Sequence, residues 1–553
     1  MIRTIIKSPQ YCQKRGLAQE AVAAGGVGII GKVRNEIVMK ILLAGPGTGK
    51  TTKIKTLIKE QYANAENILV LSFTNATVND LTESFVDYPN VRCFTLHSYA
   101  LIINHLNDYH ILDDTYETPI LSRFAENYNI EFSKICYFFH CITFDGMIKE
   151  CSAFLKSNPV YGEEKVGALD LLIVDEFQDF NLPERELIFQ LSIYAKETLI
   201  LGDDDQSIYG FKDADPVGII ELFNSPDVEK IPHENKCYRC PDVVVDHSKK
   251  LISKNVNRID KSWEKTNKAG NVFFTQKMSQ EEANQIIFDV IAKVKKDEPK
   301  SSILVLSPVR YYVENLVALL EAGGISFVDF WTSKISIEDI VKIWWSRAIF
   351  ANKKILNLTF IANTSCTDHF KKKFNEIIRD ALQKNFNEAT ILEMVVDIFP
   401  VSFNSYILNT PSLPEFLGLH QEYAIFSDYL DSENLEESLR SLFRKFNPIT
   451  EFSRDAVNVM SIHKSKGLQA DYVFITGLVD GVLPNKIKGL DTIEAQRRLL
   501  FVGMTRSMKY LYLISQIEWE GKYVHRMDKS QFEYNYRKKK YYGRASNFIS
   551  EMK

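Results

Sequence analysis

The sequence predicts an α/β protein whose parallel sheets are flanked by helices, and three segments carry this prediction. An apolar strand at Ile41–Ala44 runs into a glycine-rich loop and then into a helical pattern. A second apolar run, Leu171–Val174, ends in acids, as buried parallel strands do at the ligand-binding edge of a sheet. A third segment, Ser301–Phe327, has the pattern of a strand–helix–strand unit. Alternation of this kind is typical of sheets covered by helices.

Length and composition set the broad class of the protein. At 553 residues the chain is too long for one hydrophobic core, and three or four domains are expected. Its net charge of -4 gives no argument for a nucleic-acid partner. No stretch reaches the ~20 apolar residues of a membrane span, and the flank of the short apolar run at 21–31 is wrong for a signal peptide. Eight cysteines without regular spacing suit a reducing compartment, so we expect a cytoplasmic protein.

The cysteines raise two metal-site hypotheses. Cys237 and Cys240 form a C-x-x-C, but no second pair stands at zinc-finger spacing. A second group could supply the four ligands of an iron–sulfur cluster, namely Cys93, Cys136, Cys141 and Cys151. We favour the simpler interpretation that these are buried cysteines without a metal.

The C-terminal segment differs in charge from the rest of the chain. Residues 522–553 contain nine Lys/Arg against three Asp/Glu, and aromatic residues interleave the cations in YNYRKKKYYGR. Taken alone, this composition favours a solvated terminal segment.

The strongest local pattern is the glycine-rich loop after the first strand. Its glycines let successive backbone N–H groups turn toward phosphates, its lysine can reach the β- and γ-phosphates, and its threonine hydroxyl can ligate Mg²⁺. A flexible glycine-containing turn would not explain the strand before the loop, the helix after it and the Lys-Thr pair together. The predicted nucleotide-binding residues of this loop are Ala44, Gly45, Pro46, Gly47, Thr48, Gly49, Lys50, Thr51 and Thr52.

The acids of the segment ALDLLIVDEFQD complete the predicted hydrolysis site. Asp175 stands at the carboxyl end of its strand and is a predicted Mg²⁺ ligand together with Thr51. Glu176 is the predicted base for the attacking water. A strand merely capped by turn-forming acids would not explain why they follow a phosphate-binding loop. ATP and Mg²⁺ are therefore the predicted cofactors.

Seven ordered segments give the chain a family resemblance. Beside the phosphate-binding loop they are SFTNATVNDL, TLHSYAL, DEFQD with GDDDQSIYG, CYRCP, VNVMSIHKSKGLQADYVFITGLVDGVLP and EAQRRLLFVGMTRS. Together they resemble, in order, the motifs of the UvrD/Rep family of superfamily 1 helicases. RASNFISEM resembles the segment that closes the second motor domain of that family. The resemblance implies two RecA-like P-loop motor domains with mainly helical insert subdomains.

The resemblance also implies roles for individual residues. We call the β-strands that end at DEFQD and at GDDDQSIYG the two acid-tipped strands. In the family these two strands are neighbours in the sheet. The second is followed by a glutamine beside the γ-phosphate and by an aromatic residue that faces the single-stranded DNA. The implied catalytic residues are Glu176, Gln206, Arg239 and Arg506, and the implied nucleotide contacts outside the loop are Tyr238 and Gln469. The implied DNA contacts are Phe73, Thr74, Asn75, His97, Tyr209, Phe211 and His463.

Two positions depart from the family pattern. The family has Trp-Arg-Gly where this chain has Phe211-Lys212-Asp213. Phenylalanine offers a weaker stacking surface than tryptophan, and Asp213 adds a negative charge beside the DNA backbone. Gln469 replaces the family's ribose-contacting glutamate, and no adenine-reading glutamine is evident upstream of the loop.

The motif positions predict the domain boundaries. An N-terminal extension takes residues 1–38, the first motor domain 39–99 with 152–232, a helical insert 100–151, the second motor domain 233–333 with 452–553, and a reduced helical insert 334–451. Three runs of the second insert, at 337–350, 370–386 and 435–446, have 3.6-residue periodicity, which predicts helices.

The resemblance implies an ATP-dependent DNA helicase or translocase that moves 3′→5′ on single-stranded or tailed duplex DNA. One alternative is a DNA-dependent ATPase that regulates a protein effector partner, for example in a bacterial antiphage defence system. A P-loop ATPase unrelated to nucleic acid is disfavoured by the strand-contacting motifs.

Overall fold

The computed structural model describes residues 38–103, 109–277, 279–331, 335–350, 353–399, 401–423, 438, 451–485, 493–524 and 528–553. The chain forms two compact units. One comprises Met1–Ile103, Ile148–Trp331 and Phe452–Lys553, and the other Asn104–Met147 with Thr332–Glu451. Apart from Val38, the predicted N-terminal extension lies outside the described residues, as does the predicted helix at 435–446 apart from residue 438.

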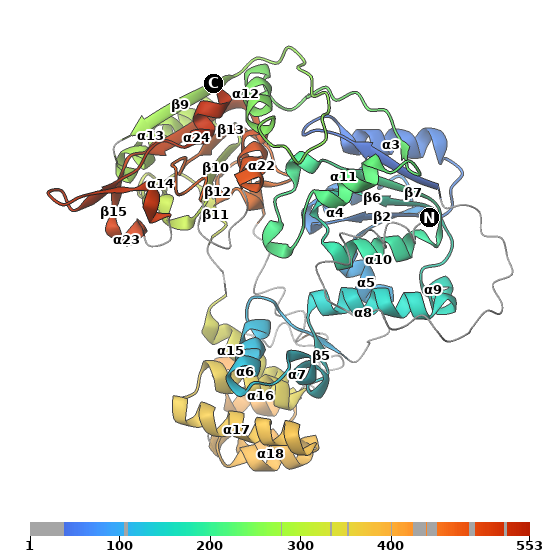
Figure 1. The fold of residues 1–553 in the computed structure, drawn as a ribbon. Helices are drawn as coiled ribbons and strands as arrows, with labels where there is room; N and C mark the ends of the chain where they lie inside the picture. Colours follow the sequence, from blue (N-terminus) through green and yellow to red (C-terminus); the bar gives the residue numbers. More distant parts are fainter. Residues whose placement is uncertain are drawn as a thin grey trace. The chain divides into compact units, whose positions relative to one another are not determined.

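The first unit contains two six-stranded parallel sheets, which are the cores of the two RecA-like motor domains (Figure 1). The first sheet has the strand order β3 (Val91–Thr95), β2 (Ile68–Ser72), β6 (Leu169–Val174), β7 (Ala195–Gly202), β1 (Val38–Leu43) and β8 (Glu229–Lys230). Strands β6 and β7 pair directly, which confirms that the two acid-tipped strands are neighbours. Strand β7 also pairs with β1, so the loops after all three strands meet at one edge of the sheet.

Helices cover both faces of the first sheet because its central strands, such as β2 and β6, are apolar and buried on both faces. The helices of this domain are α3 (Lys50–Gln61), α4 (Asn75–Ser84), α5 (Leu96–Ile103), α8 (Phe144–Ser157), α9 (Pro159–Lys165), α10 (Leu182–Ser192) and α11 (Val217–Asn224). Ile54 and Ile58 of α3 share one buried cluster with Ile173 of β6 and Leu201 of β7. Figure 1 places α3 and α10 on opposite faces of the sheet.

The second sheet repeats this construction. Its order is β11 (Phe327–Asp329), β12 (Val457–Ser461), β10 (Ile303–Ser307), β13 (Ala470–Ile475), β14 (Ser507–Gln516) and β9 (Asn271–Lys277). One face packs on α13 (Gln280–Asp297) and α14 (Glu314–Ala322). The other packs on α12 (Asp242–Ile252), α22 (Ile493–Met504) and α24 (Asn547–Met552). The predicted strand–helix–strand segment supplies β10, α14 and β11.

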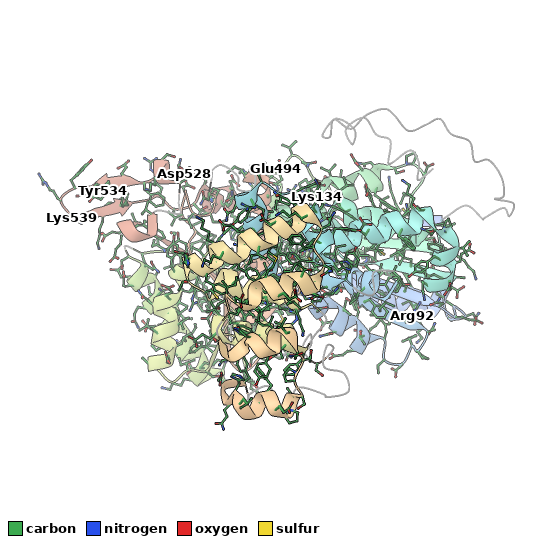
Figure 2. All side chains as sticks on the ribbon, turned by 90° about the horizontal axis from the view of Figure 1, so that it is seen from below. Arg92, Lys134, Glu494, Asp528, Tyr534 and Lys539 are labelled. Atoms are coloured by element: carbon green, nitrogen blue, oxygen red, sulfur yellow. The ribbon has the colours of Figure 1, made fainter. Side chains whose placement is uncertain are left out.

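The basic C-terminal segment is folded in its described part, and residues 533–539, which carry basic and aromatic side chains, are solvent-exposed as expected. It contributes to a sheet of β15 (Glu518–Glu520), β17 (Lys540–Tyr542) and β16 (Glu533–Asn535), followed by α24. The Trp519 ring packs against those of Tyr312 and Phe532 in a buried cluster, and this apolar anchor holds the segment on the second motor domain. Tyr534 and Lys539 lie at the outer end of the sheet (Figure 2).

The second unit joins the two predicted inserts in one hydrophobic core. The first insert gives β4 (His110–Ile111), α6 (Glu117–Tyr128), α7 (Phe132–Phe138) and β5 (Cys141–Ile142). The second gives α15 (Ile337–Phe350), α16 (Lys354–Thr364), α17 (Asp368–Lys384), α18 (Glu388–Val396), α19 (Val401–Leu408) and α20 (Leu413–Leu419). Leu121 and Phe124 of α6 bury in the same cluster as Trp344 of α15 and Phe360 of α16. The predicted helical periodicity is confirmed in α15 and α17.

A buried polar network also joins the two inserts. Arg347 donates to Glu117 (Nη1···Oε1 2.8 Å), and His110 lies 2.7 Å from the other carboxylate oxygen. Burial alone would raise the pKa of Glu117, but His110 and Arg347 hold it at about 2. The two inserts therefore form one body, although Glu117 and Arg347 lie 230 positions apart in the sequence.

Candidate functional site

The phosphate-binding loop connects β1 to α3. Gly47 and Gly49 have φ of 71° and 83°, in the left-handed region that favours glycine. Gly49 is the N-cap of α3 and provides no side-chain cap, so the first N–H groups of the helix are available to an anion. At Gly47 a Cβ would come within 2.5 Å of the Arg239 Cβ, so the loop also needs glycine for close packing.

The remaining loop residues are held by neighbouring segments. The Ala44 N–H donates to the Gly202 carbonyl (3.1 Å), and the Gly45 N–H donates to the Asn235 side chain (3.1 Å). The Pro46 carbonyl accepts from the indole of Trp263 (3.0 Å), which sequence reasoning did not single out. The Thr48 hydroxyl donates to the Gly45 carbonyl (2.8 Å). Thr52 is exposed in the first turn of α3.

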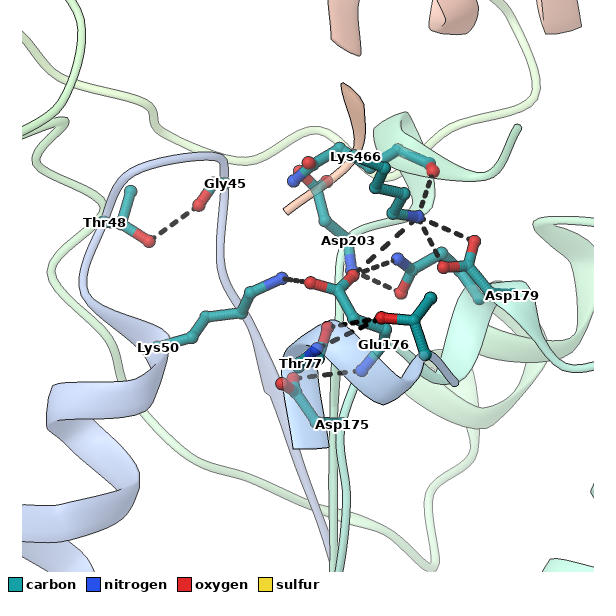
Figure 3. A network of polar contacts seen from close by, with 12 residues as sticks. Gly45, Thr48, Lys50, Thr77, Asp175, Glu176, Asp179, Asp203 and Lys466 are labelled. Carbon is teal, nitrogen blue, oxygen red and sulfur yellow. Dashed lines mark hydrogen bonds and ion pairs between the residues drawn. The ribbon is translucent and has the colours of Figure 1, made fainter. Parts of the chain in front are cut away.

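Lys50 and Glu176 form the ion pair at the centre of the site (Figure 3). The Lys50 Nζ lies 3.0 Å from Glu176 Oε1. Burial alone would raise the pKa of Glu176, but the charges of Lys50 and Lys466 hold it well below its usual range. Glu176 has a φ of 53°, a left-handed conformation that is rare for glutamate and that directs the chain sharply after β6. Glu176 is therefore an ionised carboxylate in a strained turn.

Asp175 and Thr51 are the residues that could hold a divalent metal. Asp175 is buried, and its burial together with the charge of Glu176 raises its pKa to about 6. A bound cation would offset the desolvation of the Asp175 carboxylate and its repulsion from Glu176. Carboxylate and hydroxyl oxygens are the ligands that hard cations prefer. The donor set therefore fits Mg²⁺.

The three consecutive aspartates after β7 are bound by basic side chains. Their oxygens lie within 4.8 Å of one another, but the ammonium of Lys261 lies 2.9, 2.5 and 2.8 Å from Asp203, Asp204 and Asp205. Arg258 adds a bidentate pair to Asp205 (2.9 and 2.8 Å). Burial alone would lower the pKa of Lys261, but the three carboxylates raise it. We call Lys261, Arg258 and the three aspartates the acid clamp; in it the cations take the place that a metal would need.

Gln206 links the acid clamp to the second motor domain. Its Nε2 donates to Asp203 (2.7 Å), and its Oε1 accepts from Arg506 Nη2 (3.1 Å). Arg506 is fully buried, and burial together with the nearby charge of Arg239 lowers its pKa to about 9. Lys466 donates to both Asp179 (2.7 Å) and the Gln206 carbonyl (2.7 Å). The two predicted catalytic residues Gln206 and Arg506 are therefore in direct contact.

The segment before α12 places the other predicted nucleotide contacts. The Tyr238 N–H donates to the Gly47 carbonyl (2.9 Å), and its ring is exposed, as a stacking surface for a base must be. Arg239 Nε donates to Gln469 Oε1 (3.0 Å). Gln469 thus contacts an arginine of the site in this structure.

An aromatic cluster continues from Gln206 along the same loop. The Tyr209 ring centroid lies 4.9 Å from that of Phe73 and 5.8 Å from that of Phe211. Phe211 also meets His463 edge to face at 5.4 Å and remains 63% exposed. Burial lowers the pKa of His463 to about 4, so this imidazole is neutral at physiological pH. The cluster offers an exposed ring on which a base can stack.

Two predicted DNA contacts, Thr74 and His97, have structural partners of their own, and a third, Asn75, follows Thr74 directly. Thr74 caps α4 by accepting from the Thr77 N–H (3.2 Å), and Asn75 is the exposed first residue of that helix. His97 lies 3.6 Å from a carboxylate oxygen of Glu184.

Sequence reasoning missed several residues of the site. Arg258 and Lys261 stand in NRIDKSW, a stretch with no local pattern, so no sequence signal identifies them. Lys466 lies inside the recognised segment HKSKG and could have been found there.

The cysteines that the structure describes form no group that could hold a metal. The seven cysteines in the described part of the chain are free, and the hypothetical iron–sulfur ligands divide between the units, with Cys93 and Cys151 in the first and Cys136 and Cys141 in the second. Across the residues that can be described, no helix is both long and apolar enough to cross a membrane.

Comparisons with known proteins agree with this geometry. Residues 29–212 match a family model described as an AAA domain, and residues 359–518 match the UvrD-like helicase C-terminal domain. A probable DNA helicase II homolog of Mycoplasma capricolum is 24% identical over 89% of this chain and 86% of its own length. The ATP-dependent DNA helicase Rep of Buchnera aphidicola is 23% identical over 85% of this chain and 92% of its own. DNA helicase II of Rickettsia typhi is 24% identical over 86% and 89%.

Proposed function

We propose that this protein moves 3′→5′ along single-stranded DNA. The chain belongs to the UvrD/Rep-like family of superfamily 1 helicases, and it is therefore an ATP-dependent DNA helicase, which is a hydrolase. One observation carries the proposal. The loop from Asp203 to Phe211 holds Gln206 against Arg506 at one end and an exposed aromatic ring at the other. A displacement of Gln206 by the γ-phosphate is thereby passed along five residues to the ring that stacks on a base.

Nucleotide binding begins at the ion pair of Lys50 and Glu176. The triphosphate competes with Glu176 for the Lys50 ammonium, while the N–H groups at the start of α3 take phosphate oxygens. Thr51 and Asp175 would hold Mg²⁺, which neutralises phosphate charge when it is bound. Once Lys50 turns to the phosphates, the freed carboxylate of Glu176 serves as base for the attacking water.

The second motor domain supplies the positive charge for turnover. Arg239 and Arg506 stabilise the charge that develops on the transferred phosphoryl group. Gln206 exchanges its bond with Arg506 for one with the γ-phosphate, so it acts as the sensor of the bound nucleotide. Lys466 bridges Asp179 and the Gln206 carbonyl, and thus ties the second domain to this loop.

The substrate we propose is single-stranded or tailed duplex DNA in the cytoplasm. Aromatic stacking accepts any base, at ~1–3 kcal/mol per base, and therefore suits movement without sequence preference. Phosphate contacts should supply most of the affinity, so binding should weaken steeply with salt.

A strand-displacement assay tests the proposal. Duplexes with either a 3′ or a 5′ single-stranded tail are incubated with ATP, and the released strand is measured. We expect release from the 3′-tailed substrate alone. Glu176→Gln should bind ATP and the tail but release almost nothing. Release from the 5′-tailed substrate alone would reject the polarity.

A second candidate is a DNA-dependent ATPase that regulates a protein effector, as in an antiphage system. The observation that favours it is Asp213, which holds a left-handed φ of 59° two residues after Phe211 and places a negative charge near the strand surface. Strong DNA-stimulated hydrolysis without strand release from either substrate would select this candidate. Restored release in Asp213→Gly would assign the defect to that charge.

A further inference from the structure

Two cysteines flank the nucleotide-gripping residues Tyr238 and Arg239. The side chains of Cys237 and Cys240 are both fully buried. The Cys240 N–H donates to the Cys237 sulfur at 3.4 Å. The Cys240 thiol has two acceptors within reach, the Cys237 sulfur and the Thr505 carbonyl, the latter at 3.4 Å. The two sulfurs are therefore neighbours within hydrogen-bonding reach of each other.

We propose that Cys237 and Cys240 are an oxidation site, at which a low-molecular-weight disulfide forms an intramolecular disulfide that slows ATP turnover. Cytosolic disulfides of this kind are commonly transient and regulatory. The inference rests on the proposed function only for its effect on turnover, since formation of the bond is measured separately.

Cys237 has the character of the attacking thiolate. The hydrogen bond from the Cys240 thiol, the N–H groups of Cys240 and Arg239, and the charge of Arg239 outweigh burial and lower the pKa of Cys237 to about 7. Burial raises the pKa of Cys240 well above its usual value, so Cys240 stays a thiol until its partner has reacted. C-x-x-C pairs divide these two roles in the same way.

The reaction balances as two exchange steps. The Cys237 thiolate attacks one sulfur of the small disulfide, forms a mixed disulfide and releases one small thiolate. Cys240 then loses its proton to solvent and attacks the Cys237 sulfur, which releases the second small thiolate. Two protein thiols are oxidised to one disulfide, and one small disulfide is reduced to two thiols.

The new bond alters the supports of both arginines. An S–S bond of about 2.05 Å draws the Cys240 sulfur toward Cys237 and away from the Thr505 carbonyl, whose residue directly precedes Arg506. It also tightens the turn that carries Arg239. The phosphate-binding loop lies in the first motor domain and keeps Lys50. Turnover should therefore fall while nucleotide affinity is largely kept.

Access to the pair should depend on the bound nucleotide. A Cβ at Gly47 would lie 3.3 Å from the Cys237 sulfur, so the phosphate-binding loop covers this cysteine. An oxidant reaches it when that loop and the Cys237 segment separate. A bound nucleotide, which contacts both, should slow the oxidation.

The test uses the full chain, reduced and then treated with oxidised glutathione, with and without a non-hydrolysable ATP analogue. Peptide mapping after alkylation locates the bond, and DNA-stimulated turnover is measured before oxidation, after it, and after dithiothreitol. We expect a Cys237–Cys240 bond, a fall in kcat of about tenfold, a KM for ATP within about threefold, and recovery on reduction. The analogue should slow bond formation.

Matched variants make the result decisive. Cys237→Ser and Cys240→Ser, each compared with its own reduced sample, should lose the response, whereas Cys136→Ser, which removes one of two neighbouring cysteines in the insert unit, should keep it. Absence of the mapped bond, a bond without change in kcat, or an equal response in Cys237→Ser would overturn the proposal. Absence of turnover in the reduced chain would instead reject the proposed function, and mapping would still decide the oxidation site.

Discussion

Lys261→Met is the substitution that tests the acid clamp most directly. The Lys261 side chain is only 8% exposed, and its ammonium lies within 2.9 Å of each of three buried carboxylates. Methionine keeps the apolar part of the side chain but leaves the three carboxylates without the ammonium that neutralises them. Removing one partner of a buried pair costs about 3–5 kcal/mol. Because Arg258 still neutralises Asp205, we expect a loss near 3 kcal/mol in the free energy of unfolding.

The same variant should lose catalysis and acquire a pH dependence. Asp203 accepts the amide of Gln206, so its repulsion from Asp204 displaces the sensor from Arg506 and lowers kcat more than it raises KM for ATP. The unpaired carboxylates should bind protons more tightly in the native state than at the ~3.9 of unfolded aspartate. The native state then holds more protons than the unfolded state, so the variant's stability should fall as the pH rises above about 4.

Urea unfolding and steady-state kinetics measure both effects. Lys265→Met is the control, because Lys265 pairs with Asp246 at 3.0 Å but both side chains are about half exposed, and its loss should change stability by less than ~0.5 kcal/mol. Asp204→Asn added to Lys261→Met should recover part of the stability by removing one charge. Equal stabilities for Lys261→Met and Lys265→Met, with unchanged kcat, would refute the reasoning.

Three further predictions follow from other parts of the structure. Arg506→Ala should keep nucleotide affinity within about tenfold while hydrolysis falls by around 10³; Arg506→Lys should recover turnover only in part, and near-normal turnover in Arg506→Ala would remove it from catalysis. Phe211→Ala should weaken single-strand binding by about 1–3 kcal/mol in a fluorescence titration, with little change in DNA-independent hydrolysis; equal affinity would exclude stacking there. Arg347→Met leaves Glu117 buried beside His110, so thermal melting should show a loss of about 3 kcal/mol, and an unchanged melting temperature would contradict the buried network.

The sequence by itself determined the parts of this protein that depend on contiguous residues. A phosphate-binding loop places its glycines, Lys50 and Thr51 within a few residues of one strand end, so the printed order already contains the chemistry. The acids that follow β6 and β7 could also be predicted from the sequence, because buried parallel strands are continuous apolar runs and ligands bind at their carboxyl ends. The helices of the second insert followed from their 3.6-residue periodicity.

Only the tertiary structure decided which distant side chains meet. Lys261 lies 56 to 58 positions from the aspartates that it neutralises, and no local pattern marks a lysine as buried. Periodicity likewise does not predict the shared core of the two inserts. Nor does it predict the contact between Gln206 and Arg506, which lie 300 positions apart. Periodicity reports which face of an element is apolar, whereas pairing between elements is selected by packing and by the cost of leaving a buried charge alone.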